Sequence, residues 1–87
     1  MEPELKFLEE DIFSAMANRL KQGKLINGKA TKNQLASDIN RKGKVDFIEP
    51  ILDKLEEKGL EKGLVKKLRY HVKITEKGVE KALKDYS

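Results

Sequence analysis

Apolar residues recur at intervals of three and four near the start of the chain, which is the spacing of one face of an α-helix. This pattern predicts a helix over residues 4–22, ended by Gly23. Its apolar stripe consists of Leu5, Leu8, Ile12, Ala15, Met16 and Leu20. Phe7 lies outside the stripe, so we expect it to be available for a contact with a second copy of the chain.

A second, shorter helix is predicted over residues 32–41. Thr31 is followed three residues later by Gln34, which is the spacing of a capping box at a helix start. Between the two helices the Asn27–Gly28 pair indicates a turn, and a brief strand is expected at residues 25–26.

A third helix is predicted over residues 46–58, after a tight turn that contains Gly43. Asp46 and Glu49 have the spacing of a second capping box, with Pro50 as the fourth helical residue. Its predicted buried stripe consists of Ile48, Ile51, Leu52 and Leu55, and Gly59 is the expected stop.

The last part of the chain changes to an alternating pattern. Tyr70, Val72 and Ile74 alternate with polar residues, which predicts a half-buried strand. Its predicted partner contains Leu60, Leu64 and Val65, and the connection between the strands is expected near Lys66–Lys67. A final amphipathic helix follows Thr75, with an apolar face made of Val79, Ala82, Leu83 and Tyr86.

These elements predict a single α+β domain over residues 1–87, mostly helical. The segments LEEKGL (55–60) and YHVKITEKGVEKAL (70–83) resemble the recognition helix, wing and last helix of small winged-helix regulators, both archaeal and MarR- or PadR-like. The resemblance covers about residues 30–87 and implies a winged helix-turn-helix: three helices, a β-hairpin wing and a short C-terminal helix. It also implies binding of double-stranded DNA and regulation of transcription.

Charge is distributed unevenly along the chain, whose net charge is +4. Residues 1–19 and 45–59 each sum to −3, whereas residues 20–44 sum to +6 and residues 60–87 to +4. Two interpretations stay open: the basic segments are ordinary solvated surface, or they converge on one DNA-binding face.

The exposed face of the predicted third helix carries a net negative charge, which is unfavourable for a helix that binds DNA. Opposite its apolar stripe stand three carboxylates, Glu49, Asp53 and Glu57, beside one amine, Lys54. Three explanations are open. Only the N-terminal end of the helix touches DNA; the wing and residues 32–44 do most of the binding; or the carboxylates pair with a basic protein partner.

The DNA contacts expected from this reading fall into four groups. Phosphate contacts are expected from Lys32, Asn33 and Gln34, and backbone contacts at the groove edge from Arg41, Lys42 and Lys44. Base-edge contacts are expected from Phe47 and Glu49. The wing contacts are expected from Lys66, Lys67 and Arg69.

Other functions have little support in the sequence. The chain has no cysteine, its only histidine is His71, and no phosphate-binding loop is present, so we expect neither an enzyme nor a cofactor or metal site. A cytoplasmic homodimer is expected, joined through the first helix or through the last helix with Tyr86. No membrane segment or small-molecule ligand is inferred. The alternative is a winged-helix module that binds protein and not DNA; RNA binding is a weaker alternative.

Overall fold

The computed structural model describes residues 3–58 and 63–85, with side chains over 8–56 and 63–84. The elements in chain order are α1 (Pro3–Lys21), β1 (Lys29–Thr31), α2 (Lys32–Asp38), α3 (Val45–Asp53), β2 (Val65–Lys67), β3 (His71–Ile74) and α4 (Glu76–Asp85). A single π-helical turn, η1 (Lys54–Lys58), continues α3. Some predictions rest on residues outside these described side chains: Leu5, Phe7, Glu57, Gly59, Leu60 and Tyr86.

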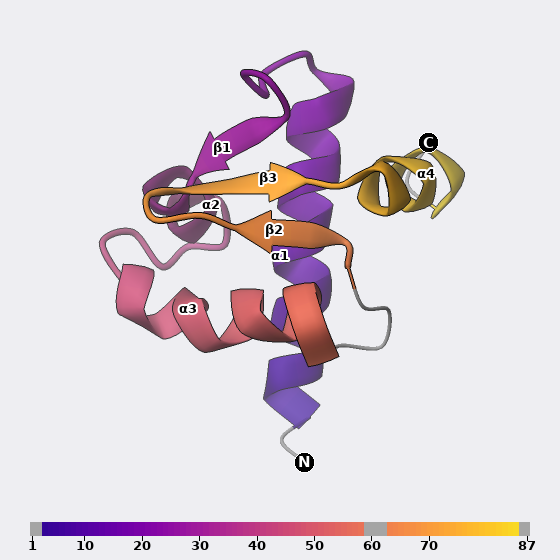
Figure 1. Cartoon of the computed structure of the whole chain (residues 1–87). Helices are drawn as coiled ribbons and strands as arrows, with labels where there is room; N and C mark the ends of the chain where they lie inside the picture. The colour runs from indigo at the N-terminus through magenta and orange to yellow at the C-terminus, as the bar shows by residue number, and fades with distance from the viewer. Residues whose placement is uncertain (1–2, 59–62, 86–87) are drawn as a thin grey trace.

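The three strands form an antiparallel sheet in the order β1-β3-β2. Figure 1 shows α1 passing behind the sheet, with α3 and η1 beside β2 and α4 beyond the end of β3. The described chain is therefore α+β and mostly helical, and that part of the predicted fold class is confirmed.

The core is built around α1, which contacts α2, α3 and α4. Ile12, Ala15 and Met16 are buried as predicted. Phe13 and Ala17 are also buried, although the predicted stripe did not include them. A helix covered from several sides buries a wider face than a helix that lies on a single partner, so a single stripe of i, i+3 and i+4 positions underestimates the core.

The first capping box is confirmed. The backbone N–H of Gln34 donates to Thr31 Oγ1 and the N–H of Thr31 donates to Gln34 Oε1, both at 3.0 Å. The helix is shorter than predicted, because α2 ends at Asp38. Asn40 has a φ of 61°, in the left-handed region, and this residue turns the chain toward α3.

The second capping box was wrong. Helix α3 begins at Val45 after Lys44, which makes no side-chain cap hydrogen bond. Pro50 is consequently the sixth helical residue. The Glu49 side chain does not turn back to the helix start because it pairs with lysines of other elements. The stripe predicted for this helix is confirmed, since Ile48, Ile51, Leu52 and Leu55 are all buried.

The predicted strand at residues 25–26 is replaced by β1 at Lys29–Thr31. Ile26 makes only an isolated bridge with Lys29 across the Asn27–Gly28 turn, and its side chain is exposed. Both turn residues have positive φ, 54° and 76°, as a two-residue hairpin turn requires. The turn predicted at Asn27–Gly28 is therefore confirmed, but the strand follows this turn instead of preceding it.

The hairpin of β2 and β3 was predicted, but its connection was misplaced. The strands are joined by residues 68–70, so Lys66 and Lys67 lie within β2. Tyr70 belongs to this connection and is 66% exposed, which contradicts its predicted burial. Val72 and Ile74 are buried as expected, because they lie in the regular part of β3.

The last helix starts as predicted after Thr75. The Gly78 N–H donates to Thr75 Oγ1 at 3.0 Å, and the Thr75 hydroxyl also lies 3.0 Å from the Leu64 carbonyl oxygen. Ala82 is buried, whereas Leu83 is exposed. The first turn of α4 is thus attached to the start of β2.

Candidate nucleic-acid interface

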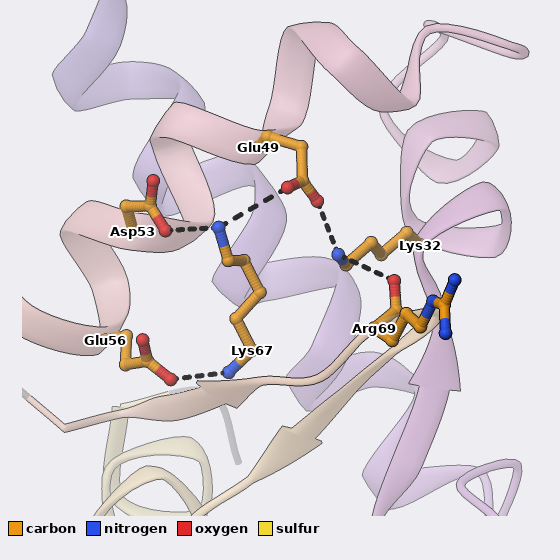
Figure 2. Close-up of polar contacts among 6 residues, drawn as sticks. All are labelled: Lys32, Glu49, Asp53, Glu56, Lys67 and Arg69. Carbon is orange, nitrogen blue, oxygen red and sulfur yellow. Dashed lines mark hydrogen bonds and ion pairs between the residues drawn. The ribbon is translucent and has the colours of Figure 1, made fainter.

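The acidic side of α3 faces lysines of the same chain. Glu49 Oε1 lies 2.5 Å from Lys32 Nζ, and Glu49 Oε2 lies 3.4 Å from Lys67 Nζ. Asp53 Oδ1 lies 2.5 Å from Lys67 Nζ. Figure 2 shows both lysines reaching toward α3. We call Lys32, Glu49, Asp53 and Lys67 the ion-pair cluster. Its two ammonium groups balance its two carboxylates.

Lys32 is the first residue of α2 and is only 6% exposed. Its ammonium also donates to the carbonyl oxygen of Arg69 at 3.0 Å, and its backbone N–H donates to the carbonyl oxygen of Tyr70 at 3.1 Å. The connection between β2 and β3 is therefore held against the start of α2. Burial of an ammonium group is favourable only with such partners.

Lys67 lies in the middle of a second set of contacts, between β2 and the α3–η1 helix (Figure 2). Its ammonium is shared between Asp53 and Glu49, and its backbone N–H donates to Glu56 Oε2 at 2.8 Å. Strand β2 is an edge of the sheet, so this N–H has no strand partner on that side. The Glu56 carboxylate accepts the hydrogen bond from this N–H, so the edge strand does not offer it to another chain.

Proton affinities in the cluster follow from these contacts. The hydrogen bond from Lys32 lowers the pKa of Glu49, against the opposing effect of its partial burial. The hydrogen bond to Asp53 raises the pKa of Lys67, again against burial, and Glu49 adds to that rise. Both shifts favour the charged forms, which stabilises the pairs near neutral pH.

Three of the residues expected to touch DNA belong to this ion-pair cluster. Glu49 pairs with both Lys32 and Lys67, so all three side chains are engaged within the chain, and their contacts at phosphates, at base edges and in the wing stay predictions. The pairing has a physical reason: oppositely charged groups brought together by the fold attract each other more strongly when they are partly removed from water.

The remaining expected contacts are exposed. They are Asn33, Gln34, Arg41, Lys42, Lys44, Phe47, Lys66 and Arg69. Gln34 is already used by the capping box. Arg41, Lys42 and Lys44 lie together in the connection between α2 and α3, and Phe47 lies in the first turn of α3.

Two exposed aromatic rings lie beside arginines. The Arg41 guanidinium is 5.5 Å from the centre of the Phe47 ring, and the Arg69 guanidinium is 5.2 Å from the centre of the Tyr70 ring. The second pair was missed because Tyr70 was assigned to the buried side of a strand. Such pairs hold an arginine near a flat apolar surface while its N–H groups stay available to other acceptors.

A polar hollow lies between α1 and the end of α2. It is lined by Asp11, Ser14, Asn18, Arg19, Asp38 and Asn40, among others. Arg19 donates two hydrogen bonds to Asp38, at 2.6 and 3.0 Å, and this contact raises the pKa of Arg19. The pair fastens the end of α2 to α1.

Two other kinds of site are absent from the described part of the chain. Among the described side chains of residues 8–56 and 63–84, no three His, Asp or Glu residues are grouped so that they could hold a metal ion. No helix among residues 3–58 and 63–85 is long and apolar enough to cross a membrane.

No protein family matches this sequence, and no curated protein or solved structure matches it either.

Proposed function

We propose that this chain is a winged-helix protein that binds double-stranded DNA and regulates transcription as a homodimer. The order of elements supports the proposal: two short helices, α2 and α3, are joined by a tight connection and followed by a β-hairpin. Two helices with a short turn are the helix-turn-helix arrangement, in which the N-terminal end of the second helix contacts base edges.

One observation carries the proposal. Glu49 and Asp53, two of the three carboxylates predicted on the acidic side of α3, are paired with Lys32 and Lys67, while three bases just before the helix stay exposed. Arg41, Lys42 and Lys44 thereby give the N-terminal end of the helix a local positive charge. Phosphate contacts from such bases supply most of the non-specific affinity for DNA.

The expected interface has a defined centre. Arg41, Lys42 and Lys44 would neutralise phosphates at the groove edge, and Phe47 would contact a thymine methyl group. Asn33 and the hairpin residue Arg69 would add outer contacts. Lys32 and Lys67 act indirectly, because they neutralise Glu49 and Asp53 of α3 and Lys32 holds the hairpin connection in place.

The test is a fluorescence-anisotropy titration of mixed-sequence duplex DNA at several salt concentrations. The turn variant Lys42→Gln/Lys44→Gln removes two exposed charges. The control variant Lys24→Gln/Lys84→Gln removes two exposed charges from the α1–β1 connection and from α4. We expect the slope of log K against log salt to become shallower by about 1.8 in the turn variant, since each phosphate contact contributes about 0.9.

The control variant should change that slope by much less. Equal slopes in the two variants would mean that only total charge matters and would overturn the interface. Failure of the unmodified protein to bind DNA at low salt would overturn the proposal, and the protein-binding alternative would then take its place. Sedimentation of the protein as a monomer at tens of micromolar would contradict the homodimer.

A further inference from the structure

Three lysines stand directly opposite one another across the sheet. In the strand register, Lys73 of β3 pairs with Lys29 of β1 on one side and with Lys66 of β2 on the other. We call these three residues the lysine row. Opposite residues in antiparallel strands project from the same face of the sheet, so the three ammonium groups share one surface.

This surface points away from α3. Successive residues of a strand project to opposite faces. Lys67, next to Lys66, reaches Glu49 and Asp53 of α3. Val72, next to Lys73, is completely buried. Lys66 and Lys73 therefore project to the other face, and both are exposed. In Figure 1, α1 and α2 pass behind the strands, and no helix of the described chain lies in front of them.

The arrangement is unfavourable for the fold alone. Like charges directly opposite each other on a sheet are destabilising. No ion pair joins any of the three ammonium groups to a carboxylate within the described residues. Lysines on edge strands protect against aggregation, which accounts for Lys29 and Lys66. That explanation fails for Lys73, because β3 is the central strand.

We propose that the lysine row is a second binding site for the phosphate backbone of duplex DNA, on a different face from the α2–α3 connection. The inference rests on the proposed function. Neighbouring strands are about 4.8 Å apart, so the row spans about 10 Å. Three successive phosphates of one DNA strand advance about 7 Å along the helix axis and further along the winding strand, so the flexible side chains of the row would spread slightly to reach one phosphate each.

The chemistry of the row suits the backbone and not the bases. A lysine ammonium is a flexible point charge, which binds phosphate without the two-bond geometry that selects guanine. In the next row of the same face, His71 of β3 stands opposite Thr31 of β1, and both side chains can donate to phosphate oxygens. The site would therefore bind DNA without regard to sequence, so one chain would contact a second segment of duplex.

The experiment is an isothermal titration of the protein with a duplex of about one helical turn, ten base pairs, at low salt. Such a duplex is far shorter than the persistence length of DNA, about 150 base pairs, so it stays straight and cannot bend around the chain to contact both faces at once. We expect two binding events per chain, a tighter one at the α2–α3 connection and a weaker one at the lysine row. The weaker event should have a salt slope of up to about −2.7, for three phosphates.

Three variants separate the outcomes. Lys66→Gln/Lys73→Gln should abolish the weaker event and leave the tighter one. Lys42→Gln/Lys44→Gln should weaken the tighter event, and Lys24→Gln/Lys84→Gln should preserve both. A single event that is unchanged by Lys66→Gln/Lys73→Gln would overturn the second site while keeping the proposed function. Absence of any event would instead overturn the proposed function. Circular dichroism would confirm that each variant is folded.

Discussion

The Lys32 ammonium lies 2.5 Å from the Glu49 carboxylate and joins the first residue of α2 to the middle of α3. The same ammonium donates to the Arg69 carbonyl in the hairpin connection. One buried side chain thus holds together three parts of the chain that are far apart in sequence. The relative placement of the two helices and the hairpin therefore depends on this contact.

Replacing Lys32 with Ala should lower the free energy of unfolding by about 1–3 kcal/mol, because two partners lose their donor in a partly buried place. The measurement is urea unfolding followed by circular dichroism. The control is Asn33→Ala, at the next and exposed position of α2, which should change stability by less than about 0.5 kcal/mol. Equal effects of the two substitutions would show that the Lys32 contacts are not stabilising.

The Glu49 carboxylate should make stability depend on pH on the acid side. Its pKa in the folded chain is lowered, chiefly by the hydrogen bond from Lys32. A lowered pKa means that the folded state favours the ionised form. Its contribution is therefore fully present above the unfolded pKa of about 4.3 and is lost as pH falls through the folded value.

Comparing the unmodified protein with Glu49→Gln tests this dependence. The stability difference between them should be largest near neutral pH and should shrink below about pH 4.3. Lys67 sets the corresponding limit at alkaline pH, because its pKa in the folded chain is raised. Its contribution to stability is fully present below the unfolded pKa of about 10.4 and is lost as pH rises through the folded value. A difference that stays constant from pH 7 to the acid limit would contradict the Glu49 pairing.

Asp53 should restrain DNA binding by occupying Lys67. The Asp53 side chain is 54% exposed, so its pair with Lys67 contributes little to stability, about 0–1 kcal/mol. Asp53→Asn removes one repulsive charge and also releases part of Lys67. Glu80→Gln, at an exposed position of α4, removes one charge away from both the ion-pair cluster and the α2–α3 connection. We expect DNA affinity to rise in both variants and to rise more for Asp53→Asn.

Anisotropy titrations at one salt concentration are sufficient for this comparison. Equal gains would mean that net charge alone matters and that Lys67 stays with Glu49. A loss of affinity in Asp53→Asn would mean that the carboxylate orients Lys67 for a contact that the amide cannot support.

The helices were predictable because each has a local signal. The stripe of α3 and the cap at Thr31 depend on spacings of three and four residues, and both are confirmed. The position of the hairpin turn was not predictable in the same way. The sequence around Lys66, Lys67 and Tyr70 is compatible with a turn at either of two places. The observed place, residues 68–70, is fixed by hydrogen bonds from Lys32, which is distant in sequence.

The charge of α3 illustrates the same limit at the candidate site. Glu49 and Asp53 were placed correctly on the side opposite the apolar stripe, but their partners come from α2 and β2. Sequence spacing within one helix cannot reveal a partner on another element. The lysine row was missed for the same reason, because its three members are neighbours only through the strand register.

Lys73 should be replaceable with a gain in stability. It faces a like charge on either side, which costs about 0.2–1 kcal/mol. Lys73→Gln should therefore raise the free energy of unfolding by that amount at low salt, and less at high salt because salt screens the repulsion. Lys84→Gln, on α4, serves as the control. A destabilised Lys73→Gln would show that the lysine row makes favourable contacts within the fold.

Gly78 should resist replacement by alanine, although it lies inside a helix. Alanine is ordinarily the better helix residue by about 1 kcal/mol. Here a Cβ atom would lie 2.1 Å from the Leu64 carbonyl oxygen and 2.8 Å from Ile74 Cγ1, so α4 would have to move away from the sheet. The movement would also strain the Gly78 N–H bond to Thr75 and the contact between Thr75 and Leu64.

We therefore expect Gly78→Ala to destabilise the chain by about 1–3 kcal/mol, the usual cost of inserting atoms into a packed site. Glu80→Ala, at an exposed position of the same helix, should change stability by less than about 0.5 kcal/mol. Thermal and urea unfolding of both variants provide the measurement. A Gly78→Ala variant more stable than the unmodified protein would mean that α4 does not pack this closely on the start of β2. The glycine in the TEKG segment would then be only a poor helix residue, with no role in the contact between the last helix and the hairpin.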